Sequence, residues 1–223
     1  PNNTLKIRLT IKDRNMITKK AASIILLLAF SISMACADTQ VSRYHEFDAG
    51  EIDTLRIDAR VGTIQVEPSS SGKFEVELII TDEDRGGWFR RAPDLESMDL
   101  RSRQNGDQLR LSFNEDKVKG EWVIRVPALD QLDIELGVGT IKAYKAQFGI
   151  VADVGVGTIE LQANESDIGS VDLSVGVGDT HIKGGHDTES RRAMVSSESS
   201  ASGTGTLTIN ARAGVGKVEV ELL

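Results

Sequence analysis

The sequence predicts an all-β, single-domain protein, built as a right-handed β-solenoid-like stack with antiparallel strands capping its N-terminal end. Three observations predict this class: five segments align on one glycine, apolar residues alternate with period two around that glycine, and the alternation changes parity there. A period of two is typical of strands, whereas helices repeat every 3.6 residues. With 223 residues, 39% of them hydrophobic, the chain is long enough for one sizeable core.

Residues 16–37 have the pattern of an export signal. Lys19 and Lys20 precede an apolar run over 21–32 and a small-residue end, Ser33-Met-Ala-Cys-Ala. The run is too short to cross a bilayer as a helix, but it fits the apolar region of a signal peptide. We interpret residues 1–15 as upstream or fragment residues, because Met16 stands where the signal begins. The expected location after cleavage is the periplasm or the exterior.

Two cleavage sites compete. The pattern Ala35-Cys36-Ala37 predicts a cut before Asp38 and a released protein, whereas Ser33-Met-Ala-Cys36 is a degenerate lipobox that predicts a lipid on Cys36. Lipoboxes usually carry an aliphatic residue where Ser33 stands, which favours release. Cys36 is the single cysteine of the chain, which favours lipidation and excludes an internal disulfide framework.

The mature chain, 38–223, divides into an N-terminal segment (38–54), a first repeat with capping strands (55–131) and the remaining repeats (132–223). Between the first two aligned glycines, 73–80, 107–113 and 121–126 alternate as strands, and Asn105-Gly106 signals a hairpin turn. We expect these strands to cap the N-terminal end, which protects a solenoid from edge-to-edge aggregation.

The repeats are read from their aligned glycines, which are spaced 77, 18, 21 and 38 residues apart. Spacings of 18 to 21 suit one coil of a solenoid, and 38 leaves room for two. The low-apolar stretch 196–206 is predicted as a loop or a degenerate coil. The five corner glycines are Gly62, Gly139, Gly157, Gly178 and Gly216.

The inward positions follow from the alternation. Apolar residues stand seven, five, three and one residues before each glycine, then two and four after it, except for Thr180 in the fourth repeat. The residue directly before the glycine is valine in all five repeats (Val61, Val138, Val156, Val177 and Val215), and we expect it inside. The change of parity requires a bend, for which glycine is suited. Each repeat is therefore predicted as a strand, a glycine corner that stacks into a ladder, and a second strand.

These motifs resemble a bacterial family of "putative adhesin" domains, the toast-rack type of short β-solenoid. The matching features are Gly-Val-Gly-Thr-Ile at 137–141 and 155–159, Gly-Val-Gly-Asp at 176–179, Gly-Val-Gly-Lys-Val at 214–218, and Val126-Pro127 leading into Leu132-Asp-Ile. The resemblance covers roughly residues 45–223. It implies an exported or membrane-anchored β-solenoid with an adhesin-like role, and it brings no catalytic residues with it.

Other chemistry is weakly supported. The Gly-x-Gly pairs recur between strands, so they do not fit a phosphate loop that opens a helix. Outward acids (Asp58, Asp133, Glu135, Asp153 and Asp172) suggest calcium, but basic and neutral residues interrupt their columns, which favours a solvated face. His181, His186, Asp179 and Asp187 lie close in sequence without a fixed metal-ligand spacing, so a polar turn is favoured. We therefore expect no metal, cofactor or catalytic site.

The segment Arg85-Gly-Gly-Trp-Phe-Arg-Arg91 is the best candidate for a partner contact. It places Arg85, Trp88, Phe89, Arg90 and Arg91 in one glycine-opened loop. Arginine and tryptophan are enriched in binding hot spots. The competing interpretation is that Trp88 plugs the open end of the core.

The charge balance bears on partners. Residues 1–36 hold six of the 26 basic and one of the 34 acidic residues, so the rest of the chain has a net charge of −13. Such a body repels phosphate backbones, which excludes nucleic acid as an expected partner.

The sequence favours a non-enzymatic module that binds an envelope protein, a glycan or a lipid surface, or serves as a scaffold. Membrane contact would come only through a lipid anchor or that surface. The alternatives are a sensor or regulatory partner of a membrane stress system and a small polysaccharide-degrading β-helix enzyme.

Overall fold

A computed structural model describes residues 40–83 and 93–223, which belong to one compact unit, Thr39–Leu223. In this part of the chain nearly all regular structure is β, as the sequence predicts. The strands join in one 12-stranded sheet. The elements are β1 (Gln40–Asp48), β2 (Thr54–Pro68), β3 (Lys73–Asp82), the 3₁₀ turn η1 (Leu95–Ser97), β4 (Arg101–Asn105), β5 (Gln108–Phe113), β6 (Val118–Val126), β7 (Gln131–Ala146), β8 (Gly149–Ala163), β9 (Ile168–Lys183), β10 (His186–Ala193), β11 (Ser196–Ser202) and β12 (Leu207–Leu222).

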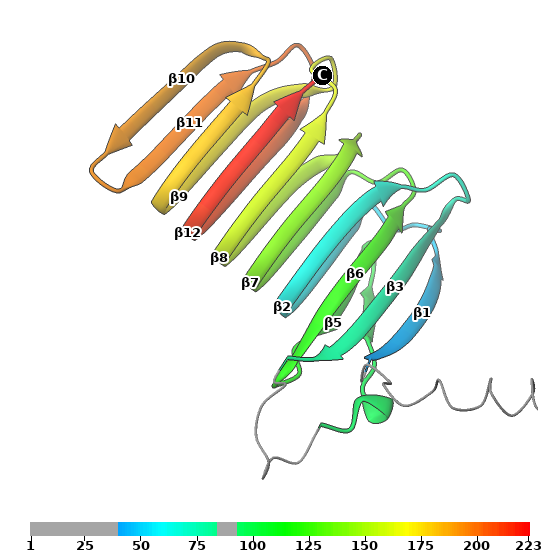
Figure 1. The fold of residues 1–223 in the computed structure, drawn as a ribbon. Coiled ribbons are helices and arrows are strands. Elements are labelled where there is room, and N and C mark those ends of the chain that lie inside the picture. Colours follow the sequence, from blue (N-terminus) through cyan, green and yellow to red (C-terminus); the bar gives the residue numbers. More distant parts are fainter. Residues whose placement is uncertain (1–39, 84–92) are drawn as a thin grey trace, which may run out of the picture. The chain divides into compact units, whose positions relative to one another are not determined.

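The five repeats form the centre of the sheet, each on one long strand. These strands lie side by side and parallel in the order β2, β7, β8, β12, β9 (Figure 1). Their aligned glycines pair in register, so the predicted ladder of corners is confirmed. The order differs from the chain order, because the last strand, β12, lies between β8 and β9.

Each long strand bends at its corner into two legs. β7 ends at Ala146 and β8 begins at Gly149, yet the two run parallel. Straight parallel strands need a crossover of a dozen or more residues, so a two-residue connection is possible only when each strand returns within its own length. Apolar residues of both legs are buried, for example Leu132, Ile134 and Ile141. The core therefore lies between the first and second legs.

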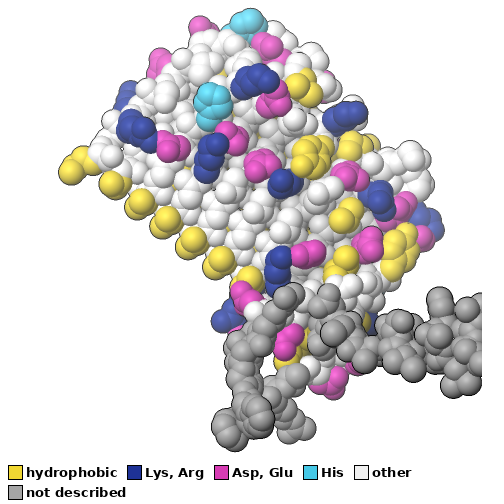
Figure 2. Space-filling model, in the orientation of Figure 1, with side chains coloured by type: hydrophobic (Ala, Val, Ile, Leu, Met, Phe, Trp, Pro, Cys, Tyr) yellow, Lys and Arg dark blue, Asp and Glu magenta, His cyan; other side chains and the backbone are white. Residues whose placement is uncertain are grey.

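The valines before the glycines do not point inward, which corrects the sequence expectation. Val138, Val156, Val177 and Val215 are between 45% and 49% exposed, and Val61 is half-buried. The buried positions stop three residues before the glycine, at Leu136 and its equivalents, and resume two residues after it. The bend thus spans several residues and turns the valine outward at its apex. Figure 2 shows the result as a row of hydrophobic side chains along the corner edge.

The N-terminal end carries the expected capping strands, with one addition. β3 pairs antiparallel with β6 and β1, and β4 with β5 across the turn at Gly106. However, β5 and β6 are parallel to β2, β5 along its first leg and β6 along its second. Together they form a broken sixth coil, in which Gly120 pairs with Gly62. Residues 114–119 stand in place of the short corner of the other coils. Because of this longer segment, the alignment on the corner glycines did not detect the sixth coil.

The C-terminal end is closed by a hairpin rather than by the second coil for which the spacing of 38 left room. β11 pairs antiparallel with the first leg of β9, and β10 with β11. The stretch predicted as a loop or degenerate coil is thus largely strand β11. Ser197 and Ser199 are buried there, and both hydroxyls lie within 2.8 Å of Thr180 Oγ1. The polar residue of the fourth repeat therefore faces the polar layer that ends the core.

Candidate functional site

The corner glycines form two columns with different contacts. A Cβ on Gly62, Gly139, Gly157, Gly178 or Gly216 would lie 1.7–1.8 Å from a carbonyl oxygen of the neighbouring corner, and their φ angles lie between +141° and +152°. A Cβ on the glycine two residues earlier, such as Gly137 or Gly155, would lie 2.6 Å from the equivalent carbonyl. Both columns are thus needed for strands to stack closely, which supports a structural role for the Gly-x-Gly pairs.

Arg60 shows why the first repeat departs from this pattern. It stands where the other repeats have their earlier glycine, as Gly137 does in β7. On the side of β2 that faces the N-terminal end of the stack, the pairing with β5 ends at Ala59 and the pairing with β6 begins at Gly62. No paired strand therefore lies directly beside Arg60 on that side. A side chain fits there, and Arg60 forms an ion pair with Asp116 in the broken corner.

The outer face of the first legs carries the acids considered for calcium. Two of them are held by arginines of neighbouring strands: Arg110 lies 2.6 Å from Asp58, and Arg56 pairs with Glu135. Towards the C-terminal end this face has a shallow depression of about 500 Å³, whose lining includes Asp172, Arg191 and Arg212. Mixed charges across the strands make this a solvated polar face.

The outer face of the second legs holds Tyr144 beside further charged residues. Lys142 lies 3.0 Å from Glu160 on the next strand, and the hydrogen bond to that carboxylate raises the pKa of the Lys142 ammonium. Glu221 accepts hydrogen bonds from Lys183 and Gln162, which lower the pKa of its carboxyl. A depression of about 240 Å³ lies here, with Tyr144 and His181 in its lining.

The histidines considered as metal ligands do not converge. His186 contacts Glu165, 3.0 Å away, and Asp179 pairs with Arg192 instead of with a histidine. His181 lies on the second-leg face of β9. Within residues 40–83 and 93–223, no three His, Cys, Asp or Glu side chains are grouped so that they could hold a metal ion.

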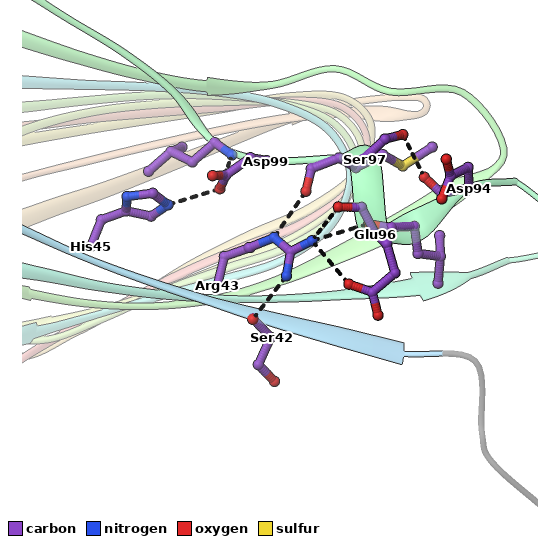
Figure 3. A network of polar contacts seen from close by, with 10 residues as sticks. Ser42, Arg43, His45, Asp94, Glu96, Ser97 and Asp99 are labelled. Carbon is purple, nitrogen blue, oxygen red and sulfur yellow. Dashed lines mark hydrogen bonds and ion pairs between the residues drawn. The ribbon is translucent and has the colours of Figure 1, made fainter.

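The favoured contact loop, Arg85, Trp88, Phe89, Arg90 and Arg91, lies outside the described residues, as does Cys36. The structure does show how the chain is held on both sides of the loop. Before it, the Glu83 amide donates to the Lys117 carbonyl over 3.1 Å. After it, residues 94–100 are attached to the edge strand β1 by a network of polar contacts (Figure 3).

Arg43 is the centre of this attachment. Its guanidinium donates to the carbonyls of Met98 (3.0 Å), Glu96 (2.8 Å) and Leu95 (3.4 Å) (Figure 3). The side chain is 22% exposed, so these bonds are partly shielded from water. We call Arg43, His45 and Asp99 the β1 clamp.

The second contact of the clamp joins His45 and Asp99, whose Nε2 and Oδ1 atoms are 2.8 Å apart. Burial alone would raise the pKa of the Asp99 carboxyl. The hydrogen bonds from His45 and from the Leu100 amide, together with nearby positive charge, outweigh burial and lower that pKa. The carboxylate is therefore the form that holds the clamp.

Sequence reasoning missed both the β1 clamp and the outward valines. The segment 38–54 was assigned no element, although Val41, Arg43, His45 and Phe47 alternate with exposed residues as in a strand. In the sequence this alternation is hidden, because two of the four inward residues, Arg43 and His45, are polar. Nothing in the sequence pairs Arg43 with carbonyls more than fifty residues away.

Comparison with known proteins gives a likeness of fold. No protein-family model matches the chain, and no curated protein matches it. A solved structure of a "putative cell adhesion protein" from Clostridium sporogenes superposes with a TM-score of 0.50 at 12% identity, over 83% of this chain and 100% of that one. A "putative adhesin" from Bacteroides fragilis has 14% identity and a TM-score of 0.28, over 82% of this chain and 98% of its own. At these identities, the Clostridium likeness shows that both chains share a fold.

The described part of the chain has no helix long and apolar enough to cross a membrane.

Proposed function

We propose that this protein is an exported, non-enzymatic module of the cell envelope, with an adhesin-like binding or scaffolding role. Its fold supports the proposal, because a solved structure with this architecture is named for cell adhesion. The export signal at 16–37 would place it in the periplasm or outside the cell, either released or anchored through Cys36.

One observation supports a contact at the segment around Trp88: the described residues on both sides of it are fixed to the sheet. The Glu83 amide bond holds one side, and the hydrogen bond from Arg43 to the Leu95 carbonyl holds the other, twelve residues later. Fixed ends reduce the conformational freedom that a loop loses when it binds, so more of the contact energy remains as affinity.

The chemistry of the loop suggests an anionic partner. Three arginines, a tryptophan and a phenylalanine stand within seven residues, on a chain whose net charge after residue 36 is −13. Local positive charge on an acidic protein orients it toward anionic surfaces. Lipid head groups, an acidic glycan and an acidic patch of an envelope protein share this chemistry.

The test is Trp88→Ala in the full chain, with Tyr44→Ala as the matched control. Tyr44 is 57% exposed on β1, so Tyr44→Ala removes an exposed aromatic ring that does not belong to the segment 85–91. We expect Trp88→Ala to weaken retention on isolated envelopes while melting stays unchanged, and Tyr44→Ala to change neither. Intact masses of the same preparations show whether the chain starts at Asp38 or carries lipid on Cys36.

Three results would contradict the proposal. Unchanged retention would remove the loop as the contact. A stability loss of about 3 kcal/mol or more would show that Trp88 fills the core instead. A chain that keeps Met16 and stays in the cytoplasm would exclude the envelope role altogether.

A further inference from the structure

The exposed valines form a continuous apolar ridge at the corner of the stack. In spatial order this valine ridge consists of the half-buried Val61 and the exposed Val138, Val156, Val215 and Val177, one from each long strand. The β10–β11 turn extends it, because the Val195 carbonyl accepts a hydrogen bond from the Gly178 amide. In that turn Val195 is 59% exposed and Met194 98%. Figure 2 shows the hydrophobic row running straight along this edge.

The fold does not require valine at the apex. The core of each coil is filled by the residues three before and two after the glycine, such as Leu136 and Ile141. Threonine has a similar preference for strands, and it occupies the position after the glycine in three repeats, as Thr140 does in β7. Valine nevertheless stands at the apex of all five strands, which leaves apolar surface in water at every level of the ladder.

The middle of the ridge lies in an uncharged strip. Glycines flank each apex valine, except that Arg60 precedes Val61. The residue after the corner glycine is threonine in β2, β7 and β8, whereas the ridge ends beside Lys217 in β12 and Asp179 in β9. The acids Asp58, Glu135 and Asp153 begin farther up the first legs. Two copies of an acidic protein repel each other least where their facing surfaces are neutral. An approach along this strip avoids the charged outer faces.

The distance between neighbouring valines of the ridge indicates which kind of partner can match it along its whole length. Neighbouring parallel strands lie about 4.8 Å apart, so the valines repeat at that distance. A helix repeats every 5.4 Å and drifts from the ridge by about 2 Å over five strands. One face of an extended peptide repeats about every 6.7 Å and drifts by about 8 Å. Only another stack of strands keeps the same repeat along the whole ridge, and a second copy of this chain supplies one.

We propose that two copies of this chain associate through the valine ridge. A two-fold axis through the middle of the ridge would place Val156 at the centre, with two valines on either side. A ridge one side chain wide covers less than the roughly 800 Å² per partner of a standard interface. The dimer should therefore be weak and concentration-dependent, and it would cluster copies held close together on a surface.

This inference goes beyond the proposed function, because self-association requires no envelope partner. The first experiment uses the purified full chain in sedimentation velocity over a wide concentration range. We expect a monomer–dimer equilibrium whose dissociation constant rises about tenfold or more in Val138→Thr/Val156→Thr. The matched control is Val151→Thr, which makes the same change on the outer face of the first leg of β8 and should leave the equilibrium unchanged. Circular dichroism and melting verify that all variants keep the fold.

The second experiment does not depend on weakening the ridge. Val156→Cys should form a disulfide-linked dimer under mild oxidation, and Val151→Cys should do so much more slowly. Cys36 is present in both variants and sets the background. The ridge variant should keep its envelope retention, and Trp88→Ala should keep the dimer, so this inference and the proposed function can fail separately.

Three outcomes would overturn the inference. The native protein could stay monomeric at every concentration, as expected if a peptide or helix of another protein occupies the ridge. The Val138→Thr/Val156→Thr variant could associate as strongly as the native chain. Val156→Cys could cross-link no faster than Val151→Cys.

Discussion

At the residue scale, the fold depends on where a Cβ atom has no space. Gly157 combines two constraints: its φ is +152°, and an added Cβ would lie 1.8 Å from the Gly139 carbonyl oxygen. The neighbouring corner Gly216 repeats this contact against Gly157 itself, at 1.7 Å. A side chain at one corner therefore separates two strands at the point where both bend.

We expect Gly157→Ala to lower the free energy of unfolding by about 3 kcal/mol or more, because strain at a disfavoured φ adds to a clash with backbone. Gly149→Ala is the matched control in the same strand, since its Cβ would have ordinary contacts at 3.4 and 3.6 Å. Denaturant unfolding of both variants measures the difference. Equal losses at the two positions would contradict the stacked-corner explanation.

The β1 clamp gives a prediction for pH. The pKa of Asp99 is lowered in the folded protein, so its contribution to stability is present above the ordinary carboxyl pKa and is lost as pH falls through the lowered value. We expect Asp99→Asn to be less stable than the native chain at neutral pH and equally stable in acid below that value. Asp94→Asn, in the same segment, is the control. Thermal melts across pH measure this, and a stability difference that does not change with pH would contradict it.

At the element scale, the sequence predicts what is local and repeated. Alternation and parity identified the strands and the corner at each aligned glycine, and the structure confirms them. The prediction that the valines point inward was wrong, because it assumed that the apolar alternation continues up to the corner glycine. The chain already begins to turn two residues earlier, at the first glycine of each pair, such as Gly137. β11 was missed because serine is rarely a core residue, and the buried Ser197 and Ser199 hydroxyls are paired by a tertiary contact with Thr180 that the sequence does not show.

Among the candidate sites, too, the local and repeated features could be predicted from the sequence and the long-range contacts could not. The structural role of Gly62 and its four equivalents could be deduced, because a repeated local sequence has a repeated local cause. The β1 clamp could not, since it joins residues more than fifty positions apart. The contact loop at 85–91 stays a prediction, because it lies outside the described residues.

The hydroxyl layer at the end of the core gives the element-scale prediction. Thr180→Val preserves shape but leaves the buried Ser197 and Ser199 hydroxyls without that partner, which should cost about 1–3 kcal/mol. Adding Ser197→Ala and Ser199→Ala should recover most of the loss, because no unpaired polar group then remains. Thr208→Val, at an exposed site on β12, is the control. Urea unfolding measures all variants; a triple variant no more stable than Thr180→Val would contradict this account.

At the scale of the whole molecule, the order of the strands could not be read from the sequence. Every corner has the same register, so each repeat fits against any other, and similarity alone cannot choose neighbours. The structure places the last strand, β12, between β8 and β9, paired in parallel on both sides. A terminal coil of a solenoid contacts one neighbour, but this C-terminal strand contacts two.

Removing β12 should therefore break the stack internally instead of shortening it. A chain that ends at Thr206 loses the buried Ile209, Val218 and Val220, which at about 1.5–3 kcal/mol each amounts to about 5 kcal/mol or more. That is a large part of the roughly 5–15 kcal/mol by which domains are stable. We expect the shortened chain to lose its cooperative melting transition and to regain it when a peptide of residues 207–223 is added. The same peptide with Gly216→Ala is the control, because its Cβ would lie 1.7 Å from the Gly157 carbonyl oxygen and prevent insertion. Native-like melting of the shortened chain, indifferent to either peptide, would mean that β9 docks directly on β8 and that β12 is dispensable.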